Sequence, residues 1–274
     1  MLWVPQKGRW RIITNGGIVG TATPGTGVPS NATTLLDGAV TEIISAAAND
    51  QDSWGIGISI SATGDSAAAA EACMDILIGG ATDDVLIPAL ICGYQRNTYG
   101  RSNYLFPLHI PQGKRIAAVL ASVRTSITSQ VLIWLLGGSP PPWRVGRKVT
   151  TYGTQINNAR GQAVTPAASG GAASVTEMTA STSADHFAFM PGFQPATDTT
   201  TTDRFYNIGI GVGASVEDRI ATWWYLSNTS ESFPGPTPWT PAFYDVPSGS
   251  RLTLLAGNSG ANDAAYDGLI YAVS

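Results

Sequence analysis

Apolar and polar residues alternate with a period of two along much of the chain. The clearest stretch is 54–62, where Trp54, Ile56, Ile58 and Ile60 would share one face and glycine and serine the other. Because successive side chains of a β-strand point to opposite faces, this pattern predicts a half-buried strand. Further strands are expected at 39–45, where the alternation is mixed, at 74–80 and 84–92, and as near-continuous apolar runs, suited to burial between two layers, at 114–122 and 130–138.

Two segments depart from a regular strand pattern. Pro88 lies inside 84–92, and a proline within a strand marks an edge or a bulge because it cannot donate a ladder hydrogen bond. The run DSAAAAEACMD (65–75) favours a helix by propensity, but its counterpart later in the chain, ATDTTTTDRFYN (196–207), is polar and β-branched. We therefore expect a loop or irregular turn that leads into a strand at 72–78.

One phrase occurs twice in the chain. IPQGKRIAAVLAS at 110–122 returns as VPSGSRLTLLAGN at 246–258, 136 positions later. Other matches follow in the same order: WVPQKGR (3–9) with WRVGR (143–147), AVTEI (39–43) with SVTEM (174–178), and MDILIGG (74–80) with YNIGIGV (206–212). Collinear matches whose offsets drift slowly indicate two diverged copies of one domain, because loops gain and lose residues.

The boundary between the two copies is proline-rich. Residues 137–144 read GGSPPPWR, and consecutive prolines favour a stiff, extended spacer that continues neither a strand nor a helix. The sequence therefore predicts a first domain over 1–138, a linker over 139–145 and a second domain over 146–274.

The repeated phrase has a mechanical interpretation. Its proline would end one strand or loop, and its glycine would supply the positive φ of a tight turn. Its arginine would lie at the base of the next strand, with the stem on apolar surface and the head capping carbonyls. These residues are Pro111, Gly113 and Arg115 in the first copy and Pro247, Gly249 and Arg251 in the second. Strands with turn signals about every 8–15 residues predict an antiparallel β-sandwich in each copy, and thus an all-β fold.

Composition narrows the classes of function. Only 12% of residues are charged and the net charge is −4, which argues against a nucleic-acid partner, since that requires clustered lysine and arginine. Cys73 and Cys92 are too few for a disulfide framework and are expected to be buried thiols. The segment MLWVPQKGRW is too polar for a signal peptide, and no run of 18 uncharged apolar residues suggests a membrane span. We expect a chain that folds in a host cytoplasm without secretion.

The run DILIGGATDDVLIPALI (75–91), followed by YLFPLHIPQGKRIAA (104–118), resembles a group of virion proteins of tailed bacteriophages. The resemblance covers most of the first copy. The second copy keeps the turn phrase and N-I-G-I-G but has RIATWWYL (219–226) in place of the L-I-P-x-L piece. The resemblance implies two tandem jelly-roll-like sandwiches displayed on a virion, as a head decoration protein, a head spike or a tail accessory.

Candidate catalytic groups are sparse. His109 and His186 occupy non-equivalent positions in the two copies, and neither accompanies a G-x-S-x-G nucleophile motif. No zinc-binding or phosphate-loop motif occurs, and GIGVG (209–213) is interpreted as part of a strand. The acidic candidates are Asp83 with Asp84, Asp50 with Asp52, and Asn262 and Asp263 with Asp267; none recurs as a pair between copies. Solvation in loops or N-capping explains these acids best. A calcium site formed by Asn262, Asp263 and Asp267 is the alternative. We expect no enzymatic activity and no cofactor.

Aromatic residues gather in the second copy. TWWYL (222–226) and PTPWTPAFY (236–244) supply Trp223, Trp224, Tyr225, Trp239, Phe243 and Tyr244. Trp223 and Trp224 are adjacent, so on a strand they point to opposite faces, one toward the core and one outward. Protein contact, packing at the rim of the core and glycan stacking all remain open for this cluster.

The sequence thus predicts a structural virion protein, most simply a capsid decoration, cement or head-spike protein. The alternative is a carbohydrate-binding adsorption module on a tail or fibre. Expected partners are other copies of the chain, guessed as a trimer, and a major capsid or tail protein, with a host-surface glycan as a further option. Trp3 lies in the apolar segment MLWVP, which could lie on a neighbour or complete a sheet edge. We expect the first copy to face the virion and the second to face outward.

Overall fold

The computed structural model describes residues 11–15, 25–63, 72–79, 82–92, 101–154, 161–169, 172–195, 204–213, 218–227, 240–260 and 266–274. All helical or strand structure assigned to these residues is β-strand, and they include no helix with the length and apolar character needed to cross a membrane. The strands pair into antiparallel sheets, so the all-β fold expected from the alternation is confirmed.

The first nine strands form two facing sheets, which we call the N-lobe. Their bounds are β1 Ile12–Thr14, β2 Thr26–Pro29, β3 Thr41–Ile44, β4 Ser53–Thr63, β5 Ala72–Gly79, β6 Asp83–Ile91, β7 Arg101–Phe106, β8 Arg115–Ser122 and β9 Thr128–Gly137. One sheet has the order β1-β9-β4-β7, with β2 also on β9, and the other has the order β3-β8-β5-β6. Because β1 and β2 share one partner, they act as a single interrupted strand, and the lobe is an eight-stranded jelly roll.

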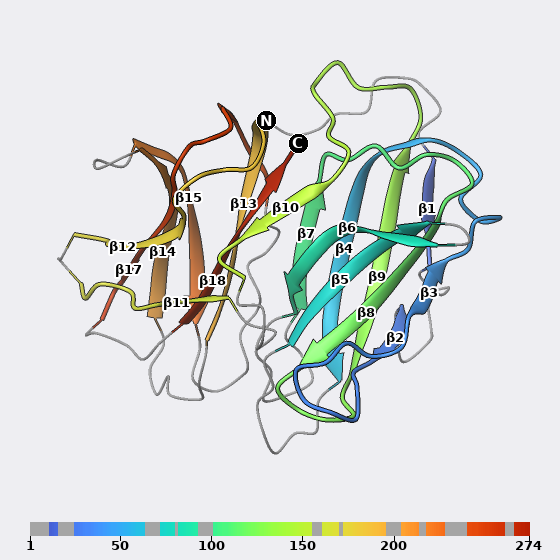
Figure 1. Ribbon diagram of the computed structural model, residues 1–274, viewed down its shortest axis with the longest axis horizontal. Coiled ribbons are helices and arrows are strands. Elements are labelled where there is room, and N and C mark those ends of the chain that lie inside the picture. Colours follow the sequence, from blue (N-terminus) through green and yellow to red (C-terminus); the bar gives the residue numbers. More distant parts are fainter. Residues whose placement is uncertain are drawn as a thin grey trace.

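The remaining strands form two more sheets, which we call the C-lobe. Their bounds are β10 Val149–Tyr152, β11 Gln162–Val164, β12 Ser174–Thr179, β13 His186–Pro195, β14 Arg204–Val212, β15 Asp218–Ser227, β16 Ala242–Val246, β17 Leu252–Asn258 and β18 Tyr266–Val273. The sheets have the orders β10-β18-β13-β16, with β11 also on β18, and β12-β17-β14-β15. The two lobes have the same strand order: each strand of the N-lobe corresponds to the C-lobe strand whose number is higher by nine. The two lobes lie side by side (Figure 1).

Alternation in the sequence becomes burial in the fold. Ile56, Ile58 and Ile60 of β4 are fully buried between the N-lobe sheets. β8 is buried almost throughout, as its apolar run predicts. β9 differs from that expectation: every second residue is only partly buried, because its sheet has an outward face. The alanine-rich residues 65–71 lie outside the described part of the chain, and the strand expected after them is β5.

β6 is an edge strand with an irregular register, as Pro88 predicts. Ala89 has φ of +54°, a left-handed conformation that is costly for a residue with a Cβ. Asp75 on β5 stabilises this bulge by accepting a hydrogen bond from the Ala89 N–H at 2.7 Å. Burial raises the pKa of the Asp75 carboxyl. The bulge turns the carbonyls of Pro88 and Ala89 toward the C-lobe.

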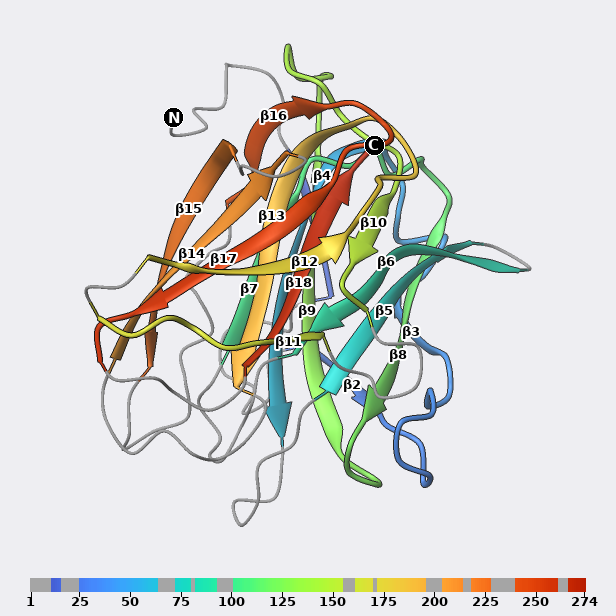
Figure 2. The same cartoon turned by 60° about the vertical axis from the view of Figure 1, so that its left-hand side comes forward.

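The C-lobe closes the N-lobe edge formed by β6 and β7. The Tyr271 hydroxyl on β18 accepts a hydrogen bond from the Ile91 N–H at 2.8 Å and donates to the Ala89 carbonyl at 3.2 Å. Its ring makes edge contacts with Tyr104 and Phe106 of β7, with centroids 5.7 and 6.0 Å apart. Thr151 on β10 donates to the Pro88 carbonyl at 2.5 Å. One continuous hydrophobic core therefore runs through both lobes, and the views agree that β6 and β10 are neighbours (Figure 2).

The proline-rich segment between the lobes is held at both ends. The Trp54 indole N–H donates to the Gly138 carbonyl at 2.9 Å on the N-lobe side. On the C-lobe side, Arg144 pairs with Asp245 at 2.9 Å and lies 4.5 Å above the Phe187 ring. Gly146 also exchanges backbone hydrogen bonds with Pro107 and His109. These contacts fix the path of the chain from one lobe to the other.

Candidate functional site

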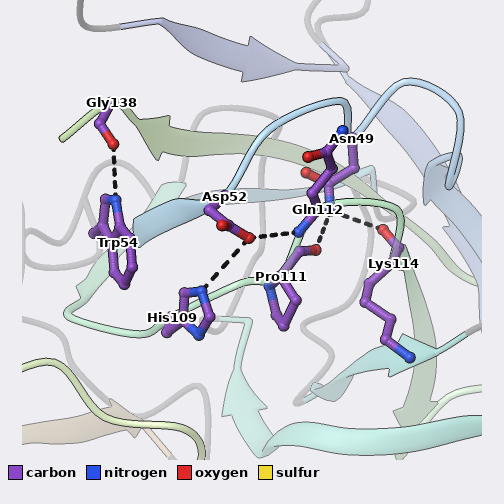
Figure 3. Close-up of polar contacts among 8 residues, drawn as sticks. All are labelled: Asn49, Asp52, Trp54, His109, Pro111, Gln112, Lys114 and Gly138. Carbon is purple, nitrogen blue, oxygen red and sulfur yellow. Dashed lines mark hydrogen bonds and ion pairs between the residues drawn. The ribbon is translucent and has the colours of Figure 1, made fainter. Parts of the chain in front are cut away.

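The repeated turn of the N-lobe is clamped by two side chains from the β3–β4 connection (Figure 3). The Asn49 amide donates to the carbonyls of Pro111 and Lys114 at 2.9 and 3.0 Å. Asp52 accepts the Gln112 N–H at 2.9 Å. Gly113, at the tip, has φ of +75° and donates its N–H to the Asn49 carbonyl at 2.7 Å. The turn is therefore positioned by its neighbours as well as by its own glycine.

The C-lobe turn is held in the same way. Thr182 takes the place of Asn49: its hydroxyl donates to the Pro247 carbonyl at 3.0 Å and accepts the Ser250 N–H at 3.1 Å. Asp185 accepts the Ser248 N–H at 2.8 Å, as Asp52 does for Gln112. Gly249 has φ of +83°. Although the acidic pairs do not recur between the copies, one acid does, and its role is to hold this turn.

The arginine of each phrase contacts an acid. Arg115 pairs with Asp83 on β6, and Arg251 pairs with Glu177 on β12 at 2.6 Å. Arg251 also donates to the Gly213 carbonyl at 3.4 Å, the kind of contact expected from the sequence. The first ion pair links β8 to β6 across β5, and the second links the start of β17 to the neighbouring strand β12. The repeated phrase therefore stabilises the fold.

The two histidines have separate packing roles. His109 stacks on Trp54, with centroids 4.5 Å apart and planes 16° from parallel, and its Nε2 lies 3.6 Å from Asp52 (Figure 3). His186 is buried in the C-lobe, where its Nε2 is 2.8 Å from the Tyr152 hydroxyl. Burial lowers the pKa of His186, so it is neutral at pH 7. Tyr152 and His186 lie edge to face, as expected for a packed pair.

Metal ligands do not cluster in the described residues, where no group of three His, Cys, Asp or Glu side chains could hold an ion. Asn262 and Asp263, considered above for calcium, lie outside the described residues, and Asp267 is buried on β18. Cys73 and Cys92 are both buried. Burial raises the pKa of the Cys92 thiol, which disfavours the reactive thiolate.

The adjacent tryptophans of β15 point in opposite directions. Trp223 packs against the core, and its indole N–H donates to the Thr240 carbonyl beside β16 at 3.1 Å. Trp224 is 68% exposed. Its side chain is the most exposed of the large hydrophobic residues in the described part of the chain. Trp224 is therefore the described aromatic residue that best fits a partner-binding role.

Besides Trp224, three aromatic residues of the C-lobe are exposed. Phe205 on β14 is 58% exposed and lies on the same face, because its neighbour Asn207 pairs with Trp224. Phe243 and Tyr244 are exposed on β16, the edge strand of the facing sheet. Phe243 pairs with Ala188, on the face of its sheet that carries Tyr271, so Phe243 and Trp224 point to opposite sides of the C-lobe. Phe205 was overlooked in the sequence, although the buried alternation of Tyr206, Ile208 and Ile210 directs it outward.

The other aromatic candidates from the sequence cannot be placed on this surface. Trp3 and Trp239 lie outside the described residues, as does the side chain of Tyr225, although its backbone belongs to β15. Of the predicted aromatic cluster, the structure thus describes Trp223 at the core and Trp224, Phe243 and Tyr244 at the surface.

No protein-family model matches the chain, and no curated protein matches its sequence. Three solved structures are similar over most of the chain, each at 9% identity. They are PNGF-II in C2 space group (TM-score 0.40, covering 97% of this chain and 65% of that one), the STIV MCP (0.32, 96% of each) and the CBM22-1-CBM22-2 tandem domain from Paenibacillus barcinonensis Xyn10C (0.28, 97% and 91%). The chain spans about 65% of the length of the PNGF-II structure. Likeness at this level indicates neither a family nor a function.

Proposed function

We propose that the protein is a non-enzymatic structural component of a bacteriophage virion, as a capsid decoration or cement protein or a head spike. The observation that carries this proposal is that a buried contact joins two jelly rolls into one block, with exposed aromatic rings on the second jelly roll. Such a block is suited to load-bearing contacts with neighbours. The segments that resemble phage virion proteins form β5 to β8, which include the edge that receives Tyr271.

The same arrangement supports an origin by duplication. Every strand of the N-lobe has a C-lobe counterpart with the same pairing, and the clamped turns fall between β7 and β8 and between β16 and β17. We infer two tandem copies, 1–138 and 146–274, joined by 139–145.

We further propose that the lobes divide the work, with the N-lobe facing the virion and the C-lobe facing outward. The exposed rings Trp224, Phe205, Phe243 and Tyr244 all belong to the C-lobe, which supports a partner on that side. The partners would be other copies of the chain, in a trimer or a larger array, and a major capsid or tail protein.

Localisation on purified particles tests the proposed function. Quantitative mass spectrometry of virions should detect the chain, and a density map should place it on the head surface or at a vertex. Particles that lack the chain should lose that density and should regain it when purified protein is added. Absence of the chain from purified virions would refute the proposal.

Two variants test the division between lobes. Removing residues 1–5 should weaken incorporation into particles, whereas replacing Trp224 and Trp239 by alanine should spare incorporation and weaken the outer contact. A buried interface tryptophan commonly contributes about 2 kcal/mol or more, so the loss is measurable in a binding assay. If the tryptophan variant fails to assemble and the truncated chain assembles normally, the assignment of the lobes is reversed.

A carbohydrate-binding role is the second candidate, and one observation favours it. Trp224 and Phe205 expose their rings on the same face of neighbouring strands, and flat aromatic faces can stack on sugar rings. A glycan array and calorimetric titration with host-surface polysaccharide would detect such binding, and Trp224→Ala should abolish it. Val175→Ala, on the far strand β12 of that sheet, is the matched control. No titratable binding by the unmodified chain would exclude this role.

A further inference from the structure

The β12-β17-β14-β15 sheet covers the side of the C-lobe that points away from the N-lobe (Figure 1). Tyr206, Ile208 and Ile210 of β14 point into the core, so the residues that alternate with them point outward. The register places residues of β15 and β17 on the same outward side. We call the surface formed by Asn207, Gly209, Arg219, Trp224, Thr253 and Gly257 the C-lobe outer face.

Glycine forms much of the floor of this face. Gly209 and Gly211 follow Asn207 on the outward side of β14, and Gly257 on β17 pairs with Asn207. A Cβ at Gly257 would meet nothing within 4 Å, so the backbone at this point is open to a ligand. The corresponding sheet of the N-lobe differs, because its outward side carries a small apolar cluster of Leu77, Ala117 and Val119.

Arg219 on β15 lies across the glycine floor. It pairs in register with Gly211, and its side chain extends over Gly209, where a Cβ would lie 3.1 Å from the Arg219 Nε. Glu177, the acid of β12 on the same side of the sheet, is already paired with Arg251. Within the described ranges no acid pairs with Arg219, so its charge is available to an anion from solution.

Two polar atoms of this face also lack a hydrogen-bond partner in the part of the chain that the structure describes. They are Oδ1 of Asn207 and Oγ1 of Thr253, both shielded from solvent. Thr253 is fully buried and points outward, because Leu252 and Leu254 on either side of it lie in the core. Buried polar atoms normally have partners. These two therefore indicate a contact that the described residues do not supply.

Trp224 lies beside this polar floor. It pairs with Asn207, two residues along β14 from Gly209, and two residues of a strand span roughly 7 Å. An aromatic ring can stack on the flat face of a sugar ring, and a guanidinium can bind a carboxylate through two parallel hydrogen bonds. One pyranose ring that carries a carboxylate can therefore contact the Trp224 ring and the Arg219 guanidinium together.

We propose that the C-lobe outer face binds an acidic polysaccharide of hexuronic acids, with Trp224 stacked on a sugar ring and Arg219 bound to its carboxylate. The negative charge of the ligand follows from Arg219 itself, because the chain as a whole has a net charge of −4 and does not attract polyanions by its overall field. The inference rests on the second candidate function, carbohydrate binding, and names its substrate class.

A sugar fits this face better than an acidic peptide does. Extended peptides are commonly recognised through backbone hydrogen bonds to an unpaired strand. β14, which carries Asn207 and Gly209, is paired on both sides, with β15 and with β17. The middle of the face thus offers a peptide no backbone hydrogen bonds, whereas a sugar needs only the flat floor, the Trp224 ring and the polar side chains.

The test is calorimetric titration with the tetramers of galacturonic acid and of mannuronic acid, and with their methyl esters, which keep the rings and lose the charge. The unmodified chain should bind at least one acid about 10-fold or more tightly than its ester. Arg219→Gln should bind acid and ester alike, because the charged partner is gone. Trp224→Ala and Gly257→Leu, which fills the open floor without removing a polar group, should weaken the binding of both.

Arg11→Gln is the matched control, since it removes an exposed arginine of the N-lobe and changes the net charge by the same amount. Its affinities should equal those of the unmodified chain, and equal unfolding midpoints verify that every variant folds. Equal affinity of the unmodified chain for acid and ester, or no binding of either acid, would overturn the inference. Tighter binding of a hexaglutamate peptide would also overturn it. Binding of a neutral polysaccharide in those cases would leave the carbohydrate role standing, and localisation on virions tests the structural role separately.

Discussion

Tyr271 lies on the outward face of its own sheet and is nevertheless fully buried. Burial raises the pKa of its phenol, and likewise that of Tyr104, so both hydroxyls stay protonated at neutral pH. Tyr104 donates to the Ile91 carbonyl at 2.6 Å, and Tyr271 bonds the N–H of the same residue. Two tyrosines from different lobes therefore satisfy one residue of the edge strand β6.

Replacing Tyr271 by phenylalanine tests this contact. The ring packing would remain, but the Ile91 N–H and the Ala89 carbonyl would lose a buried partner, which typically costs about 1–3 kcal/mol. Urea unfolding should show that loss as a lower midpoint with an unchanged slope. Tyr244→Phe, at an exposed position, should change stability by less than about 0.5 kcal/mol. Equal midpoints for Tyr271→Phe and the unmodified chain would show that these hydrogen bonds make no net contribution to stability.

His186 makes stability depend on pH. Because burial lowers its pKa below the ordinary value of 6.5, the unfolded chain takes up a proton before the folded chain does. The contribution of His186 to the free energy of unfolding is thus complete above pH 6.5 and is lost as the pH falls below that value. Urea midpoints measured from pH 8 to pH 5 should fall less steeply for His186→Gln than for His109→Gln, which keeps the buried ring. Parallel pH profiles for these two variants would contradict this assignment.

At the scale of elements, the repeated turn is built twice with different clamps. An amide in the N-lobe and a hydroxyl in the C-lobe hold the same carbonyl of the turn, while an aspartate accepts the same N–H in both. What the two turns share is a backbone shape, which needs glycine at the tip, rather than an identical set of contacts.

Alanine at either tip should be costly for a backbone reason alone. A Cβ at Gly113 or Gly249 would meet nothing within 4 Å, yet φ is positive at both, which costs an alanine about 1–2 kcal/mol. Gly257→Ala is the control, since its Cβ would also meet nothing within 4 Å and its φ is not left-handed. Thermal unfolding should lower the midpoint for the first two variants and not for the third. Similar midpoints for all three would exclude the strain argument.

The sequence predicted the elements better than their contacts. The isoleucines of β4 and the proline of β6 disclosed a strand and a bulge because those signals are local. β18, in contrast, is buried at every residue, since one face packs in its own sandwich and the other includes Tyr271 against the N-lobe. A continuous apolar run cannot show which residue points to which side, so the contact between the lobes could not be predicted. Trp224 could be, because adjacent tryptophans on a strand must diverge.

At the scale of the molecule, the lobes share one hydrophobic core, and the N-lobe edge depends on a side chain of the C-lobe. Two domains joined only by a linker would unfold independently, but a contact buried this deeply couples them. The clamped ends of the proline-rich segment act in the same direction, because they restrict how far the lobes can separate.

Calorimetry should therefore record one cooperative transition for the full chain, with equal calorimetric and van't Hoff enthalpies. Tyr271→Ala removes the ring as well as the hydroxyl, a change that costs about 3–5 kcal/mol for buried aromatic side chains, and it should resolve two transitions. Phe243→Ala, at an exposed position of β16, should keep a single transition. Two transitions in the unmodified chain would mean that the lobes are energetically independent.

The edge of the N-lobe is completed by a residue that the ribosome adds 180 positions after Ile91. At elongation rates of about 5–20 residues per second, roughly 9–36 seconds pass between the two. Throughout that time Tyr104, Phe106 and the bulge of β6 are without their partner, in a nascent chain crowded by others on the same message. Synthesis speed and chaperone supply should thus determine the yield of native protein more strongly than the final stability does, and chains released before codon 271 should be the ones that aggregate.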